Sequence, residues 1–160
     1  MHQPVCLYLK AMAKIRVTKS FTFEMAHALW NYDGPCRNIH GHSYKLFVTV
    51  AGEASSDKSS PKLGMVVDFS DLKRIVNENV VSIFDHSVVI SSMASQPEIR
   101  RVEQMFDKFY VVDYQPTCEN LVTDMASRII DFLPGNISLF SLRLIETATS
   151  WAEWFASDNS

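Results

Sequence analysis

The alternation of apolar and polar residues is most regular in two stretches near the start of the chain. From Ile15 to Glu24, apolar residues alternate with polar ones, which is the period of a strand with one buried face. From His40 to Val50, two histidines, a tyrosine and three aliphatic residues share one parity. A turn-rich stretch, 31–35, separates the two runs. Together they predict an antiparallel hairpin with a long connection.

Two later segments have the three- and four-residue spacing of amphipathic helices. The first follows Asp68, and either Asp68 or Ser70 is suited to cap its first turn; its apolar residues recur as far as Ile83. The second opens at Pro116-Thr117 and stops at Pro134-Gly135. We expect the apolar face of each helix to pack on the sheet.

The rest of the chain supplies two more predicted strands. Phe140, Leu142 and Leu144 alternate in a third strand that runs into Glu146, and residues 151–155 suit a fourth. Between the helices, residues 97–108 suit a short helix and residues 109–112 a short strand. The main order is strand, strand, helix, helix, strand, strand. It predicts an α+β fold, with two main helices on one face of a four-stranded antiparallel sheet.

Composition narrows the class of protein. The chain has 160 residues, 47% of them hydrophobic, with 15 Lys and Arg against 18 Asp and Glu, a net charge of −3. These values exclude a disordered chain, and no apolar run is long enough to span a membrane. Without a basic tract, nucleic acid is not an expected partner. Residues 14–160 are expected to form one domain, and residues 1–13 an N-terminal appendage unlike a signal peptide.

The cysteines indicate a reducing compartment, which we take to be the cytoplasm. There are three, an odd number, at widely spaced positions: Cys6, Cys36 and Cys118. Open edges of the predicted sheet favour pairing between copies of the chain, so a homo-oligomer is expected.

The histidines predict a metal site. His40 and His42 are two residues apart on a strand, so both point to one face with Cα atoms about 6.5 to 7 Å apart. His27 ends the neighbouring strand and is available as a third ligand. Three imidazoles with one open position are typical of a catalytic zinc.

Two assignments stay open at this point. Cys36, four residues before His40, fits either a closed structural zinc site or a free thiol that acts as a base or nucleophile beside the metal. Asp85-His86, after the first helix, fits either a helix C-terminal cap or a proton-transfer pair.

Six short segments in one order resemble the 6-pyruvoyltetrahydropterin synthase family, which includes the bacterial 6-carboxytetrahydropterin synthases of queuosine biosynthesis. They extend over nearly the whole chain, and the block Cys-x-x-x-His-Gly-His with the Asp-His pair is the specific part. The segments are FEMAH (23–27), CRNIHGHSY (36–44), VDF (67–69), FDH (84–86), PTCEN (116–120) and ET (146–147).

The resemblance implies a tunnelling fold, in which subunits join their sheets into a barrel, typically a hexamer made of two trimers. It implies that zinc is bound by His27, His40 and His42 and that Cys36 is a catalytic base rather than a ligand. Asp85 and His86 would form a second proton-transfer group. Glu146 would anchor the pterin ring, with Thr117 and Glu119 near the same pocket.

The resemblance also implies the reaction. The expected substrate is 7,8-dihydroneopterin triphosphate, a pterin triphosphate, and the expected product is 6-carboxy-5,6,7,8-tetrahydropterin. The alternative is elimination of triphosphate from the same substrate to give 6-pyruvoyltetrahydropterin. A hypothesis of a different class is a non-catalytic module that zinc stabilises.

Overall fold

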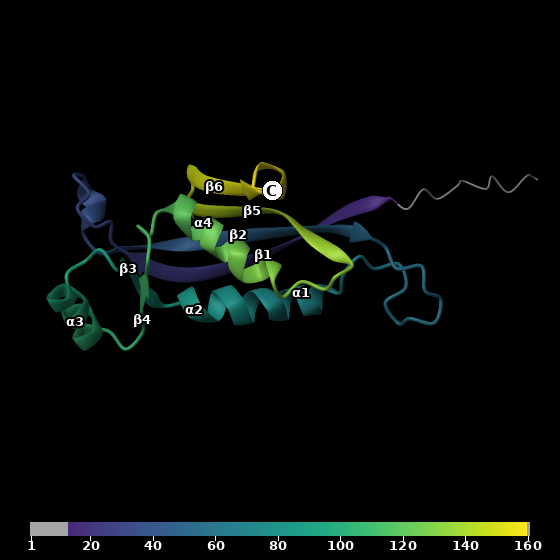
Figure 1. Cartoon of the computed structure of the whole chain (residues 1–160), viewed down its shortest axis with the longest axis horizontal. Coiled ribbons are helices and arrows are strands. Elements are labelled where there is room, and N and C mark those ends of the chain that lie inside the picture. The colour runs from purple at the N-terminus through teal and green to yellow at the C-terminus, as the bar shows by residue number, and fades with distance from the viewer. Residues whose placement is uncertain (1–12, 160) are drawn as a thin grey trace, which may run out of the picture.

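One twisted sheet organises the fold (Figure 1). The computed structural model describes residues 13–159, and within them the strand order is β4-β3-β1-β2-β5-β6. β1, β2, β5 and β6 pair antiparallel in that order, whereas β3 and β4 are parallel to β1. The strands are β1 (Lys14–His27), β2 (His40–Glu53), β3 (Ser87–Ser91), β4 (Phe109–Val112), β5 (Ile137–Thr147) and β6 (Ser150–Phe155).

The predicted α+β class is confirmed, but the strand count of four was wrong. The four antiparallel strands are present, and β4 lies at residues 109–112, where a short strand was expected. β3 was missed because all five of its residues, Ser-Val-Val-Ile-Ser, are buried. A parallel strand that is covered on both faces shows no two-residue alternation, so that period cannot reveal it.

The helices begin where the sequence places their caps. Asp68 accepts a 2.8 Å hydrogen bond from the backbone N–H of Ser70 and starts α1 (Phe69–Val76). This helix continues through a π-helical turn (Asn77–Val81) into α2 (Ser82–Phe84). Thr117 caps α4 (Cys118–Ile130), which ends before Pro134-Gly135. The short helix expected between the two main helices is α3 (Gln96–Met105).

The core lies between one face of the antiparallel sheet and the two main helices. Phe23 of β1 stacks on Tyr44 of β2, with ring centroids 5.3 Å apart. Leu72 of α1 and Leu121 of α4 have no exposed surface. Burial of side chains of this size stabilises the fold by about 1.5 to 3 kcal/mol each. The helices therefore hold the hairpin β1–β2 by packing on its apolar face.

A β-bulge in β5 changes one predicted core position. Val50 pairs with Leu139 and Thr49 pairs with Ser141, so Phe140 is an extra residue in β5. Leu139 is buried, as are the next core residues of β5, whereas the ring of Phe140 packs against Phe155, 6.1 Å away between centroids. The expected alternation through Phe140 was wrong because the bulge interrupts the period.

The strands β3 and β4 and the helix α3 lie together at the end of the sheet where β1 ends and β2 begins (Figure 1). The same end carries the connection 28–39 and its 3-10 turn, Pro35–Arg37.

Across residues 13–159, no helix combines the length and apolar character that crossing a bilayer requires. The predicted appendage, 1–13, lies outside the described residues apart from Ala13.

Candidate functional site

Three histidines meet where the hairpin β1–β2 closes over its long connection. His27 is the last residue of β1 and pairs with His40, the first residue of β2, while His42 pairs with Met25. Paired residues share a face of the sheet, so the three imidazoles project to the same side. One nitrogen from each lies within 4.8 Å of the others. This convergence is what the strand spacing predicted.

Backbone carbonyl groups orient two of these rings. Nδ1 of His27 lies 2.7 Å from the carbonyl oxygen of Pro116, and Nδ1 of His40 lies 2.9 Å from that of Asn38. A carbonyl oxygen only accepts, so each Nδ1 carries the proton and donates. The lone pair is therefore on Nε2, which is the arrangement of a histidine prepared to bind a metal.

Two of the Nε2 atoms are buried without any hydrogen-bond partner, those of His27 and His42. An unpaired buried polar atom costs about 1 to 3 kcal/mol, so such atoms call for an explanation. A cation bound between them supplies one. The donor set of three imidazoles fits a metal such as zinc.

Burial also keeps His27 in the form that binds a metal. The ring is 2% exposed, and this desolvation lowers the pKa of His27 below its ordinary value, against the opposing effect of the Pro116 carbonyl. The positive charge that His40 and His42 carry when protonated lowers it further, whereas Glu146 raises it. A neutral imidazole, which is the ligand form, is thus favoured near neutral pH.

A carboxylate faces the histidines from strand β5. Oε1 of Glu146 lies 3.7 Å from Nε2 of His27 and 4.0 Å from Nε2 of His42. The same oxygen accepts a 2.9 Å hydrogen bond from the hydroxyl of Tyr44, which is 1% exposed. The sequence prediction included Glu146, and the structure brings its carboxylate to the imidazoles of His27 and His42.

Cys36 lies in the connection, on the 3-10 turn, and its side chain is half-buried. Its sulfur is not part of the group of described ligand atoms that converge at the histidines. The backbone carbonyl of Cys36 accepts a 2.9 Å hydrogen bond from the N–H of Leu29, which closes the connection on itself. This arrangement supports the open alternative in which the thiol is not a ligand.

Asp85 and His86 form a pair after α2. Oδ1 of Asp85 lies 2.9 Å from Nδ1 of His86 and accepts a 3.0 Å hydrogen bond from the N–H of Glu24. That bond from Glu24 is the main reason the pKa of Asp85 lies below its ordinary value, and His86 adds to the effect.

His86 has φ of +58°, an uncommon left-handed conformation, and its N–H donates to the Glu24 carbonyl at 2.6 Å. Asp85 also occupies the helix C-cap, so both roles weighed from sequence are geometrically compatible.

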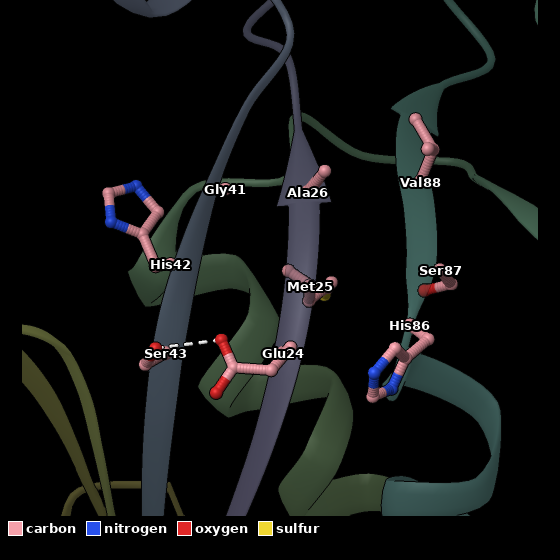
Figure 2. Close-up of a pocket in the computed structure, with 9 residues that line it drawn as sticks. All are labelled: Glu24, Met25, Ala26, Gly41, His42, Ser43, His86, Ser87 and Val88. Atoms are coloured by element: carbon pink, nitrogen blue, oxygen red, sulfur yellow. Dashed lines mark hydrogen bonds between the residues drawn. The ribbon is translucent and has the colours of Figure 1, made fainter.

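His86 does not join the other candidates within one chain. Strands β1 and β2 run between the rings of His42 and His86 (Figure 2). His86 is exposed and lines an open pocket of about 370 Å³, whose other lining residues include Glu24, His42 and Ser43. The Ser43 hydroxyl donates to Glu24 at 2.7 Å in that pocket. Among the described residues, the ring of His86 thus lies outside the group of three converging imidazoles.

The remaining predicted residues lie at the start of α4. Thr117 is the N-cap, and its hydroxyl accepts a 3.4 Å hydrogen bond from the N–H of Asn120. Glu119 stands exposed in the first turn, and its carboxylate makes no hydrogen bond or ion pair with another described residue. Cys118 is buried, and its thiol donates a hydrogen bond to the carbonyl of Leu144 at 3.3 Å.

Sequence reasoning missed two residues that orient the site. Tyr44 shares the parity of His40 and His42, and this parity was a usable sign that its hydroxyl would lie on the same face. Pro116 acts through its backbone carbonyl, which no side-chain pattern reveals. Both belong to contacts between elements that are far apart in the chain.

Comparison with known proteins agrees with this geometry. A 6-carboxy-5,6,7,8-tetrahydropterin synthase of Haemophilus influenzae is 34% identical over 141 residues, covering 87% of this chain and 97% of that protein. One from Aquifex aeolicus is 30% identical over 168 residues, covering 88% and 98%. The solved structure of Caenorhabditis elegans 6-pyruvoyl tetrahydropterin synthase shares the fold, with TM-score 0.66, 22% identity and coverage of 91% and 97%. The sequence model of the 6-pyruvoyl tetrahydropterin synthase family matches residues 16–157, and the chain therefore belongs to that family.

Proposed function

We propose that this enzyme converts 7,8-dihydroneopterin triphosphate into 6-carboxy-5,6,7,8-tetrahydropterin. The observation that carries the proposal is the group of three imidazoles, two with unpaired buried Nε2 atoms, beside an oriented carboxylate. Family membership makes the chain an enzyme of pterin metabolism. The names of the relatives from Haemophilus influenzae and Aquifex aeolicus favour the carboxy product.

His27, His40 and His42 would hold zinc through nitrogens that are already turned toward one another. When bound, zinc acts as a Lewis acid that polarises the side-chain oxygens of the substrate and so acidifies the adjacent C–H. The carbonyl of Pro116 fixes the ring of His27 for this task.

Glu146 would anchor the pterin ring. A carboxylate accepts two hydrogen bonds side by side, which matches the 2-amino group and the ring N–H of a pterin. Tyr44 holds one oxygen of Glu146, so the carboxylate meets the substrate already oriented. Thr117 and Glu119, at the start of α4, would lie near the same ring.

Protons would move through Cys36 and the pair Asp85–His86. The Asp85 carboxylate engages Nδ1 of His86, which leaves Nε2 of that ring for proton exchange with the substrate. The thiolate of Cys36 would serve as the base on the other face of the substrate side chain. A reducing cytoplasm would keep that thiol free.

The separation of the two groups within one chain favours a shared active site. The ring of His86 lies across β1 and β2 from the ring of His42, which favours a role for His86 at the zinc site of a neighbouring copy. Such sharing requires a homo-oligomer, and we propose the hexamer of two trimers that the resemblance implies.

The experiment is incubation of the purified, zinc-loaded protein with 7,8-dihydroneopterin triphosphate. The carboxy reading predicts 6-carboxy-5,6,7,8-tetrahydropterin with acetaldehyde, both identified by mass spectrometry after derivatisation. Formation of 6-pyruvoyltetrahydropterin without acetaldehyde would establish the alternative reaction. A non-catalytic zinc-stabilised module would yield neither product, and Cys36→Ala would then match the unchanged protein.

A further inference from the structure

Hydrogen bonds attach the connection between β1 and β2 to the rest of the described protein at one residue, Trp30, which also lines a pocket with Ile90 of β3 and Val102 of α3. Across residues 28–39, the hydrogen bonds seen in the described part of the chain stay within the hairpin, with the exception of two bonds at Trp30. Both go to the side chain of Gln115. This connection carries Cys36, so the two bonds at Trp30 contribute to the position of the thiol.

The attachment is a matched pair of hydrogen bonds. The N–H of Trp30 donates to Oε1 of Gln115 at 2.9 Å, and Nε2 of Gln115 donates to the carbonyl of Trp30 at 2.7 Å. Both groups are half-buried. A side-chain amide offers one donor and one acceptor side by side, so it satisfies a backbone peptide group as a neighbouring strand would.

The same residue stands next to the metal site. Gln115 precedes Pro116, whose carbonyl orients His27. The backbone carbonyl of Gln115 accepts hydrogen bonds from the N–H of Thr117 at 2.7 Å and from the side chain of Asn120 at 2.9 Å. Its backbone is thereby fixed to the first turn of α4.

Cys36 is linked to Gln115 by a short series of hydrogen bonds and one peptide bond. Trp30 follows Leu29, whose N–H donates to the carbonyl of Cys36 at 2.9 Å. The chain of contacts therefore runs from Gln115 through Trp30 and Leu29 to Cys36. From Gln115 in the other direction it runs through Pro116 to His27.

The geometry points to Gln115 as a positioning residue that sets the thiol of Cys36 relative to the histidine site. The inference rests on the proposed function, in which Cys36 is the base. Misplacing a reacting group by about 1 Å costs on the order of 10²-fold in rate, so loss of the amide pair acts on the chemical step. Zinc and pterin bind through other residues and keep their affinities.

The test uses the full-length, zinc-loaded protein. Gln115→Met keeps the length of the side chain and removes both hydrogen bonds, and Gln115→Glu, a second variant, keeps the acceptor and loses the donor. Gln104→Met, at an exposed position of α3, is the matched control. The measurements are kcat, KM, bound zinc per chain, and the alkylation rate of Cys36 followed by mass spectrometry of its peptide.

We expect both Gln115 variants to lower kcat by about 10- to 100-fold. KM and bound zinc should stay within about twofold of the unchanged protein, alkylation of Cys36 should become faster, and Gln104→Met should change none of these values. An unchanged kcat, or a loss of kcat in proportion to lost zinc, would overturn the inference. If the unchanged protein makes no pterin product, the proposed function fails, and equal alkylation rates would then refute the attachment of the connection independently.

Discussion

The hydroxyl of Tyr44 donates a 2.9 Å hydrogen bond to Oε1 of Glu146, and that oxygen lies 3.7 Å from Nε2 of His27. The two bonded residues are 102 positions apart in the chain. The contact joins β2, which supplies two of the histidines, to the end of β5, which supplies the carboxylate. A buried tyrosine thus holds a carboxylate in place before any substrate arrives.

Tyr44→Phe is expected to weaken pterin binding. The ring and its packing remain, but Oε1 of Glu146 loses the donor that orients it. We expect KM to rise about three- to tenfold, corresponding to one hydrogen bond, with bound zinc unchanged. Steady-state kinetics and metal analysis measure both values. Tyr110→Phe is the control, since its hydroxyl pairs with Arg128 away from the histidines; an equal rise in KM there would argue against a specific role for Tyr44.

His42→Ala and Cys36→Ala should separate metal binding from proton transfer. His42→Ala removes one of three converging ligands and is expected to lose most of the bound zinc together with activity. Cys36→Ala is expected to keep zinc and to lose about 10²- to 10⁴-fold in kcat. Elemental mass spectrometry measures the zinc bound per chain in each variant. Equal zinc loss in both variants would place Cys36 in the coordination sphere.

Mixing two inactive variants should restore activity if the site is shared between copies. Cys36→Ala and His86→Ala each damage one group, and in a mixed oligomer some sites receive an intact thiol from one chain and an intact imidazole from another. We expect activity to reappear after the variants are co-expressed with different affinity tags and the mixed species is purified. No recovery in a mixed oligomer that binds zinc normally would mean that both groups act within one chain.

Asp85→Asn should make the free energy of unfolding less dependent on pH in the acid range. Because the Glu24 N–H lowers the pKa of Asp85, the folded state binds the proton more weakly than the unfolded state. The resulting stabilisation is complete above the unfolded pKa of about 3.8 and is lost as the pH falls through the lower folded value. Denaturant titrations of the metal-free protein from pH 6 downward measure the free energy of unfolding. Below about pH 4, this free energy should fall less steeply with pH in the variant than in the unchanged protein. Parallel curves for the two proteins would show that the pKa of Asp85 is not lowered in the folded state.

Local sequence patterns were sufficient to predict features that depend on a single strand or helix. The period of two placed His40 and His42 on one face of their strand, since strand residues two apart must point the same way, and the predicted hairpin made His27 available beside them. Asp68 and Thr117 marked the helix starts, because a side chain that caps an N-terminus acts within three residues of itself.

The same patterns did not predict features that depend on how strands pair and pack with one another. β3 is buried on both faces and carries no alternation, and the bulge at Phe140 depends on how β5 registers with β2. The position of His86 across the strands from His42 also follows from the pairing of β3 with β1, a parallel contact that the chain reaches only after its first main helix.

The amino-acid sequence by itself predicted the α+β class, the convergence of His27 with the pair His40 and His42, and the family, because these follow from residue type, strand period and short motifs. Only the tertiary structure decided which atoms hold His27, Glu146 and the backbone of Trp30 in place. The carbonyl of Pro116, the hydroxyl of Tyr44 and the amide of Gln115 act across long separations in the chain. Such contacts exist only after the sheet and helices have packed, so no local pattern encodes them.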